Sequence, residues 1–239
     1  MNTQWKESLA EQLASVEVHA TDRQLDQLIQ YMSLILDRNQ HINLTAIREE
    51  DAFLKGHYVD SAFLCTLTEY QRAETVLDMG TGAGFPGVPL AILSPEKQFT
   101  LVDSLAKRLR VIDEFADTIG ITNVKTIHAR AEDIGHDPVH REHYDLVVSR
   151  AVAELNTLSE YCLPLVKTGG WFIAYKGAGA QEELSRATKA IHVLGGVGEK
   201  IIPYRDDEWD HSLVVIPKEK SSPKKYPRKA GTPSKTPIR

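Results

Sequence analysis

One stretch, Thr75 to Gly87, constrains the fold of this chain more than any other. It reads TVLDMGTGAGFPG, so an apolar run typical of a buried strand is followed by glycines at 80, 82, 84 and 87. Glycine permits positive φ angles and a close approach of the backbone to a ligand. A strand that runs into such a turn and then into a helix places backbone N–H groups beside a ligand. The stretch therefore predicts a nucleotide-type cofactor loop.

Two cofactors compete for this loop. Gly82 to Gly87 satisfies G-x-G-x-x-G, the dinucleotide fingerprint. Asp78, however, ends the strand just before the glycines, and its carboxylate would repel a pyrophosphate but attract the ammonium of an amino-acid ligand. Asp78 to Gly84 resembles the D-x-G-x-G-x-G loop of class I S-adenosylmethionine-dependent methyltransferases. We therefore expect S-adenosylmethionine, with a dinucleotide as the alternative; the predicted loop contacts are Asp78, Gly80, Gly82 and Gly84.

Composition places the chain among ordinary globular proteins. Its 239 residues are 42% hydrophobic and 26% charged, enough for one large domain with an appendage. No apolar run approaches the roughly 18 residues of a membrane span, and the start lacks the apolar core of a signal peptide. Cys65 and Cys162 lie far apart, which argues against a disulfide framework and for a reducing cytosol. We expect a cytoplasmic protein without a membrane partner; a monomer is the working expectation, although the sequence leaves the oligomeric state open.

The charge is distributed unevenly. From Lys218 onward the tail carries eight basic residues and one acid, whereas the net charge of the whole chain is −5. A basic tail on an acidic body suggests a polyanionic partner. Lysine and arginine on phosphates release counterions, and a tyrosine can stack on a base. We therefore expect nucleic-acid contact, with a merely solubilising tail as the alternative; the predicted contacts are Lys224, Lys225, Tyr226, Arg228, Lys229 and Lys235.

Strand and helix patterns alternate after residue 74. Before it, a capping box at Thr21 starts a helix that ends near Asn39, and helices over 6–16 and 49–70 complete a helical cap. The predicted strands are 75–79, 98–102, 124–128, 144–149 and 170–176, the predicted helices between and after them are 107–119, 153–166 and 180–194, and a closing antiparallel hairpin is predicted from 197–204 and 211–216. This alternation predicts an α/β fold with a doubly wound, mostly parallel sheet. We expect three parts: a cap at 1–70, a Rossmann-like domain at 71–217 and an irregular basic tail at 218–239.

Acidic residues follow the second and third strands. Asp103 lies 21 residues after Gly82, where a carboxylate can accept both ribose hydroxyls of an adenosine; an N-cap for the next helix is the alternative. Ala131 and Glu132 follow the third strand, in a loop that commonly contacts the adenine ring in class I methyltransferases. Glu132 as a solvated loop charge remains equally open.

Basic residues end the fourth and fifth strands. Ligands of open α/β sheets bind outside the carboxyl ends of the strands, so Arg150 and Lys176 should border the cleft. Neither an [N/D/S]-P-P-[Y/F] loop nor Pro-Cys follows the fourth strand, which argues against methylation of an exocyclic amine or of cytosine C5. Arg150 suits a target such as guanine N7, which needs no proton removed, and arginine can donate to guanine O6 or a phosphate. Arg150 and Lys176 are therefore the catalytic candidates, and no residue is assigned as catalytic. The alternatives are that Arg150 pairs with a surface carboxylate and that Lys176 holds a phosphate or caps the sheet.

Three histidines, His136, His140 and His143, lie close together with Asp137. The first two would share one face of a helix, as metal ligands do, but Pro138 breaks that helix. We expect a polar loop and no metal.

Several further motifs extend over nearly the whole chain: Asn43-Leu44-Thr45, His57 with Asp60-Ser61, VLDMGTGAGFPGVPLAI, Arg130-Ala131-Glu132, SRAVA, YKG and YPRKAGTPSKTPI. Together they resemble the bacterial RsmG (GidB) family of 16S ribosomal RNA guanine-N7 methyltransferases. The Gly-Phe-Pro-Gly turn and the YPR-x-x-G-x-P-x-K-x-P ending are far more specific than the generic glycine loop.

The resemblance implies a class I methyltransferase fold, S-adenosylmethionine as donor, S-adenosylhomocysteine as product, and one target guanine in a small-subunit rRNA hairpin near the decoding site. Carried over by position, it implies cofactor contacts at Gly80, Phe85, Ala131, Glu132 and Arg150, with Asp103 at the ribose. Arg150 could thus serve the cofactor or the target base.

We expect in-line attack of guanine N7 on the sulfonium methyl, driven by positioning rather than by a general base, on a base splayed out of its loop. An NAD(P)-dependent oxidoreductase and a non-catalytic ribosome-binding protein remain the alternatives.

Overall fold

The protein is described from a computed structural model, which covers residues 3–205 and 210–239. The segment before the sheet contains α1 Thr3–Ser15, α2 Asp22–Arg38, α3 Glu50–Phe53, η1 Leu54–Val59, α4 Asp60–Ala62, η2 Phe63–Thr66 and α5 Thr68–Arg72. The alternating part contains β1 Thr75–Met79, α6 Gly87–Leu93, β2 Gln98–Asp103, α7 Ala106–Ile119, β3 Val124–His128, α8 Ala131–Ile134, β4 Tyr144–Arg150, α9 Leu155–Cys162, η3 Leu163–Leu165, β5 Val166–Lys176, α10 Ala180–Val193, β6 Lys200–Arg205 and β7 Asp210–Pro217, and α11 Thr232–Lys235 lies in the tail.

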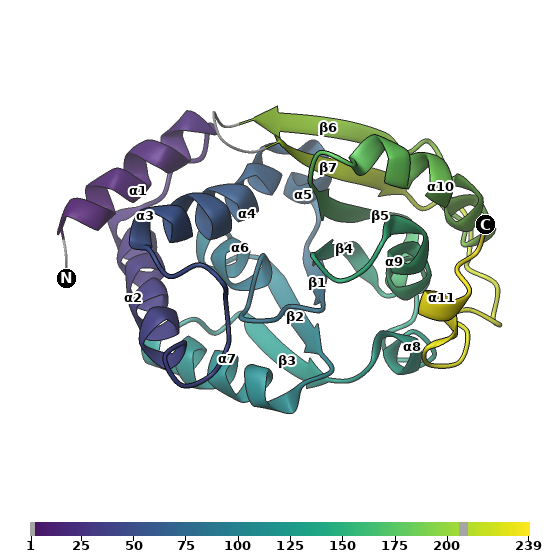
Figure 1. The fold of residues 1–239 in the computed structure, drawn as a ribbon, viewed down its shortest axis with the longest axis horizontal. Coiled ribbons are helices and arrows are strands. Elements are labelled where there is room, and N and C mark those ends of the chain that lie inside the picture. Colours follow the sequence, from purple (N-terminus) through teal and green to yellow (C-terminus); the bar gives the residue numbers. More distant parts are fainter. Residues whose placement is uncertain (1–2, 206–209) are drawn as a thin grey trace.

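The strands form one sheet in the order β3-β2-β1-β4-β5-β7-β6 (Figure 1). Strands β1 to β5 are parallel to one another, whereas β7 runs antiparallel between β5 and β6. The chain order reverses direction at β1, because β2 and β3 extend to one side and β4 and β5 to the other. The predicted doubly wound, mostly parallel sheet and its closing hairpin are confirmed, and the carboxyl end of β1 lies at the switch point where such folds bind ligands.

Helices cover both faces of the sheet (Figure 1). The cap helices, α6 and α7 share one apolar core with strand residues such as Val76, while α9 and α10 share the other with Leu77. Successive side chains of a strand point to opposite faces, and both faces are dry, so the central strands read as continuous apolar runs. The helical segment before β1 therefore packs as part of one layer, joined to α6 and α7 by a common core.

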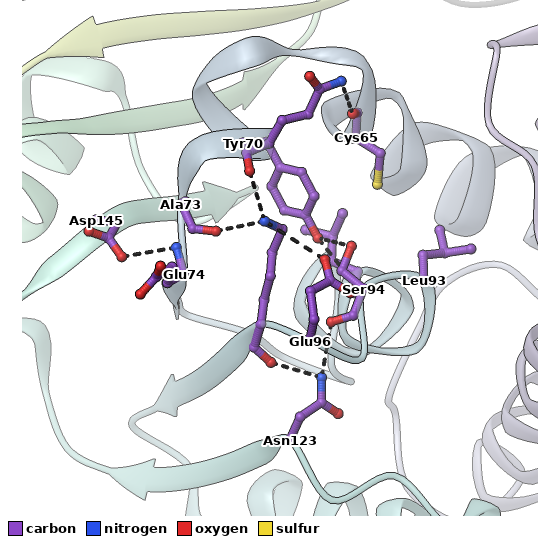
Figure 2. A network of polar contacts seen from close by, with 12 residues as sticks. Cys65, Tyr70, Ala73, Glu74, Leu93, Ser94, Glu96, Asn123 and Asp145 are labelled. Carbon is purple, nitrogen blue, oxygen red and sulfur yellow. Dashed lines mark hydrogen bonds and ion pairs between the residues drawn. The ribbon is translucent and has the colours of Figure 1, made fainter.

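The amino edge of the sheet is closed by hydrogen bonds between segments distant in sequence (Figure 2). The Asn123 side-chain amide donates to the carbonyl oxygens of Ala91, Ser94 and Lys97 at 3.0–3.3 Å. The Asp145 carboxylate accepts from the N–H groups of Glu74 and Thr75 at 3.0 and 2.8 Å. These bonds fix the start of β1 and its neighbours.

Two of the predicted helices differ from the structure. The predicted 49–70 helix is a chain of short segments, and η1 within it is π-helical around the buried Gly56. The predicted 153–166 helix is shorter, since α9 ends at Cys162. Pro164 lacks the N–H that would bond to the carbonyl of Glu160, so the chain tightens into η3 and enters β5 early.

The tail is mostly irregular, as expected, but it lies against the domain and forms the short α11 beside α8 and α9 (Figure 1). Across residues 3–205 and 210–239, no helix combines the length and hydrophobicity needed to cross a membrane.

Candidate functional site

The glycine loop between β1 and α6 folds over the carboxyl end of the sheet. Gly80, Gly82 and Gly84 have φ angles of +74°, +61° and +89°, which L side chains rarely adopt. The N–H groups of Gly80 and Thr81 donate to the carbonyl of Val102 at 2.8 and 3.0 Å and so tie the loop to β2. A Cβ at Gly80 would lie 2.3 Å from Cγ2 of Val152, whereas one at Gly82 would meet nothing within 4 Å among the described atoms.

Asp78 lies inside this loop rather than on its surface. The side chain is fully buried, and its Oδ2 accepts from the Thr81 hydroxyl at 2.7 Å and from the Gly87 N–H at 3.0 Å. Burial raises the pKa of this carboxyl to about 6 despite those two hydrogen bonds. In the structure Asp78 holds the loop through Oδ2, and its contact with a cofactor ammonium stays a prediction.

A cavity of about 440 Å³ opens at the carboxyl ends of β1, β2 and β3. Its volume is in the range of small-molecule sites, roughly 300–1,000 Å³. Of the predicted cofactor residues, it is lined by Gly80, Asp103, Ala131 and Glu132; the other lining residues are Met79, Val102, Ser104, Ala129, Arg130, Val152, Ala153, Tyr161, Gly231 and Ser234. A larger hollow of about 730 Å³ lies between Trp5 of α1, α2 and Arg48, away from the strand ends. The smaller cavity occupies the switch point and is the candidate cofactor site.

Asp103 presents a carboxylate to this cavity. Its Oδ2 accepts from the N–H of Gly82 at 3.0 Å and its Oδ1 from the N–H of Leu105 at 2.8 Å. Each carboxylate oxygen has a second lone pair, so both oxygens can still accept a hydroxyl. The two readings of Asp103 thus coexist, because it ties the turn into α7 and keeps acceptors for a ribose diol. These acceptors fit the ribose hydroxyls in the adenosine part of S-adenosylmethionine.

Glu132, in the first turn of α8, also lines this cavity. Its Oε1 accepts from the N–H of Gly231 at 2.9 Å, and the side chain is buried. The equally open reading of a solvated loop charge is therefore wrong, since Glu132 joins α8 to the tail.

Arg150 and Phe85 lie together outside the lining of this cavity. Arg150 donates to the carbonyl of Gly56 at 3.0 Å and to Oδ2 of Asp60 at 2.5 Å. His57 bonds to Arg150 at 2.8 Å and stacks on Phe85 with ring centroids 4.2 Å apart. Burial and the charge of Arg150 lower the pKa of His57 to about 3. The neutral ring therefore accepts from Arg150 through Nδ1 and donates through Nε2 to the Thr45 hydroxyl at 2.8 Å.

Asp60 is the centre of this cluster. It also binds the hydroxyl of Tyr204 and Nδ1 of His211, the latter at 2.7 Å. Burial alone would raise the pKa of Asp60, but the His211 hydrogen bond and the Arg150 charge outweigh it and hold that pKa below its usual value. The cluster joins the cap to β4 and β7. Sequence reasoning gave Asp60, Tyr204 and His211 no role, because their meeting depends on the sheet order and leaves no local pattern.

Lys176 is engaged by its own neighbours. Its Nζ donates to the carbonyl of Ala153 at 2.8 Å and pairs with Glu183 at 2.7 Å, and Glu183 also accepts from the N–H of Leu155. Ala153 lines the cavity. Lys176 therefore supports the loop between β4 and α9, which favours the reading of a cap on the sheet, and its contact with a phosphate stays a prediction.

The tail divides into packed and exposed residues. Tyr226 is 8% exposed and belongs to an apolar core, so its ring is closed to base stacking. Arg228 forms a bidentate pair with the buried Glu160, with bonds of 2.6–3.1 Å. The remaining predicted contacts are exposed: Lys224, Lys225, Lys229 and Lys235.

The three histidines have structural partners, and the ring of His143 packs edge-on against Tyr144. His136 bonds to the carbonyl of Pro227 at 2.6 Å, and His140 to the Tyr144 hydroxyl at 2.7 Å. Among the residues that the structure describes, no three histidine, cysteine or acidic side chains are grouped as metal ligands would be.

Comparison with known proteins agrees with this geometry. The chain is 48% identical over 239 residues to a ribosomal RNA small subunit methyltransferase G from Alkaliphilus oremlandii, covering 98% of this chain and 99% of the relative. It is 46% identical over 226 residues to the one from Clostridium novyi, covering 94% and 93%. Among solved structures, the S-adenosylmethionine-dependent methyltransferase SibL in its apo form matches with a TM-score of 0.56 at 13% identity, covering 89% of this chain and 74% of SibL.

The fold is thus that of class I methyltransferases, and the chain is an S-adenosylmethionine-dependent methyltransferase. This decides between the two cofactors that the glycine loop left open. The family model of rRNA small subunit methyltransferase G matches residues 24–208, and together with the relatives it shows that this chain belongs to that family.

Proposed function

We propose that this chain transfers the methyl group of S-adenosylmethionine to N7 of one guanine in 16S ribosomal RNA, in a small-subunit hairpin near the decoding site. The names of the relatives identify small-subunit ribosomal RNA as the class of substrate. The sequence resemblance to the RsmG family implies guanine N7 as the methylated atom and the hairpin near the decoding site. The observation that carries the proposal is a cavity at the switch point of the sheet, lined by carboxylates that can accept the hydroxyls of an adenosine, in a chain that matches that family along its length.

Bound S-adenosylmethionine supplies an electrophilic sulfonium methyl group. Guanine N7 has a free lone pair, so the new C–N bond forms as the C–S bond breaks and the positive charge passes from sulfur to the ring without a proton transfer. This transfer requires no proton acceptor, so the carboxylates that line the cavity, Asp103 and Glu132, serve to bind and not as a general base. The protein therefore acts by binding and orienting the two reactants.

The RNA would be held by the exposed lysines of the tail: Lys224, Lys225, Lys229 and Lys235. Lys235 follows the cavity-lining Ser234, so phosphate contacts there would place RNA at the mouth of the cofactor site. We place the reaction on small-subunit RNA in the cytoplasm, with a monomer as the active species.

The test is methyl transfer from labelled S-adenosylmethionine to small-subunit rRNA that lacks the modification, followed by chemical cleavage at N7-methylguanine. One labelled guanine in one hairpin is the expected result. Tight cofactor binding without any label on RNA or on assembled subunits would overturn the proposed substrate and leave the fold and cofactor in place.

A further inference from the structure

The tail is built into the wall of the cofactor cavity. Gly231 and Ser234, from the last residues of the chain, line the same cavity as Gly80 and Asp103 of the central strands. The residues between them and the body of the domain cross the surface of α8 and α9 (Figure 1). A basic extension that only bound nucleic acid would need none of this packing.

Side chains of α8 and α9 fix the tail at three successive places. Glu160 of α9 is fully buried and receives both the N–H and the guanidinium of Arg228, at 2.6–3.1 Å. Glu132 of α8 then accepts from the N–H of Gly231 at 2.9 Å. Finally, the hydroxyl of Thr157 donates to the carbonyl of Pro233 at 3.1 Å. Burying a carboxylate costs free energy of folding unless the charge is paired. The pair of Glu160 and Arg228 therefore fixes the tail segment that carries Gly231 and Ser234.

We propose that residues 228–236 form a cofactor-binding element that closes the adenosine end of the cavity. Residues 228–236 meet Glu132 through the N–H of Gly231, and Glu132 lines the same cavity as Asp103, where a ribose would bind. Gly231 presents backbone at this point with a φ of +80°, and the Ser234 hydroxyl, which donates to the carbonyl of Gly231 at 3.1 Å, keeps its acceptor lone pairs. The proposal depends on the cofactor but not on the RNA substrate.

The main test places a bulky side chain in the cavity and leaves the tail contacts of Glu160, Glu132 and Thr157 unaltered. Ser234→Trp places a large ring at an exposed, cavity-lining position, and Ser221→Trp is the matched control at an exposed tail position outside the cavity lining. Binding of S-adenosylhomocysteine and of methylthioadenosine is measured by calorimetry in the absence of RNA. We expect Ser234→Trp to weaken both ligands at least tenfold and Ser221→Trp to change neither by more than twofold. Equal affinities in the two variants would overturn the proposal.

Limited trypsin digestion of the unaltered protein provides a second measurement. S-adenosylhomocysteine should slow cleavage after Lys229 and Lys235 at least fivefold, while cleavage after Lys224 and Lys225 keeps its rate. Equal protection at all four lysines, or at none, would contradict a wall confined to 228–236. If the Ser234→Trp effect is found but no rRNA is methylated, the wall stands and the proposed substrate fails.

Discussion

Aspartates have different roles at the two sides of the sheet, the amino edge where the parallel strands begin and the carboxyl edge where they end. At the amino edge, Asp145 accepts from the N–H of Glu74 (Figure 2). It also accepts from the N–H and the hydroxyl of Thr75 and pairs with Lys167. At the carboxyl edge, Asp103 accepts from two main-chain N–H groups, lies 3.5 Å from the guanidinium of Arg108 and borders a cavity. Oδ1 of Asp78, fully buried beneath the loop, has no hydrogen-bond partner among the described groups.

The two edges differ in how many hydrogen-bond acceptors and how much open space they leave for a ligand. Side chains and backbone of the protein satisfy the amino edge, which therefore contributes to stability. The carboxyl edge keeps space and spare acceptors, which is where open α/β sheets bind their ligands. Substitutions at the two edges should accordingly separate folding from cofactor binding.

The largest effect is expected at Gly80. Gly80→Ala adds a Cβ 2.3 Å from Val152 at a φ of +74°, so the loop must move and S-adenosylhomocysteine affinity should fall at least a hundredfold in calorimetry. Gly120→Ala is the matched control, because Gly120 has a φ of +71° and open space around its Cβ. The control should lose about 1–2 kcal/mol of stability from strain alone and bind normally. Similar binding losses in both variants would show that strain, and not the cavity, is responsible.

A smaller effect is expected from Asp103→Asn. A hydrogen bond to a charged group is worth about 1.5–3 kcal/mol, so loss of the charge should weaken cofactor binding by about one to two powers of ten. Asp145→Asn, at the other edge, should lower the thermal midpoint but leave the dissociation constant within twofold. If Asp145→Asn weakened binding as much as Asp103→Asn, the separation of the two edges would be wrong.

The two edges should also differ in their pH dependence. The pKa of Asp145 is held at about 2 because the Lys167 and Thr75 hydrogen bonds outweigh its partial burial, so its stabilisation is present above about pH 4 and is lost as the pH falls toward 2. The pKa of Asp78 is raised to about 6 by burial. The folded state then holds its proton more tightly than the unfolded chain, and stability declines as the pH rises from about 4 to 6. Urea unfolding between pH 3 and 8 should show this decline in the parent and not in Asp78→Asn; a decline of equal size in both would refute the assignment.

The smallest effect concerns the exposed tail lysines. Replacing Lys224 and Lys225 by serine should weaken RNA binding several-fold and reduce the slope of log affinity against log salt by about 1–2, with cofactor affinity unchanged. Lys189→Ser, an exposed lysine on α10, is the control. An unchanged slope in the double variant would remove these lysines from the RNA contact.

Local patterns predicted much of the fold and part of the site. The strand, glycines and helix from Thr75 to Gly87 are adjacent in sequence, so their conformation could be inferred directly. Asp103, Ala131 and Glu132 could be placed beside Gly80 because parallel strands meet at one edge. All four line the cavity.

Contacts between distant segments could not be predicted in this way. Asp78 turns inward because Gly87, nine residues later, donates to it. Arg150 is bound by Asp60, ninety residues earlier. The tail composition suggested solvent exposure, yet Arg228 pairs with Glu160, which reads in sequence as an ordinary helix-surface acid. The π-helical turn at Leu54–Val59 has no signature in a helical apolar period.

A crystal structure with S-adenosylhomocysteine tests the central claim most directly. The account predicts adenosine in the cavity beside Asp103 and Glu132, with Gly231 and Ser234 over its outer side and the Arg150–Asp60 pair intact. Adenosine bound against Phe85 and His57, with Arg150 released from Asp60 to hold the ligand, would contradict it.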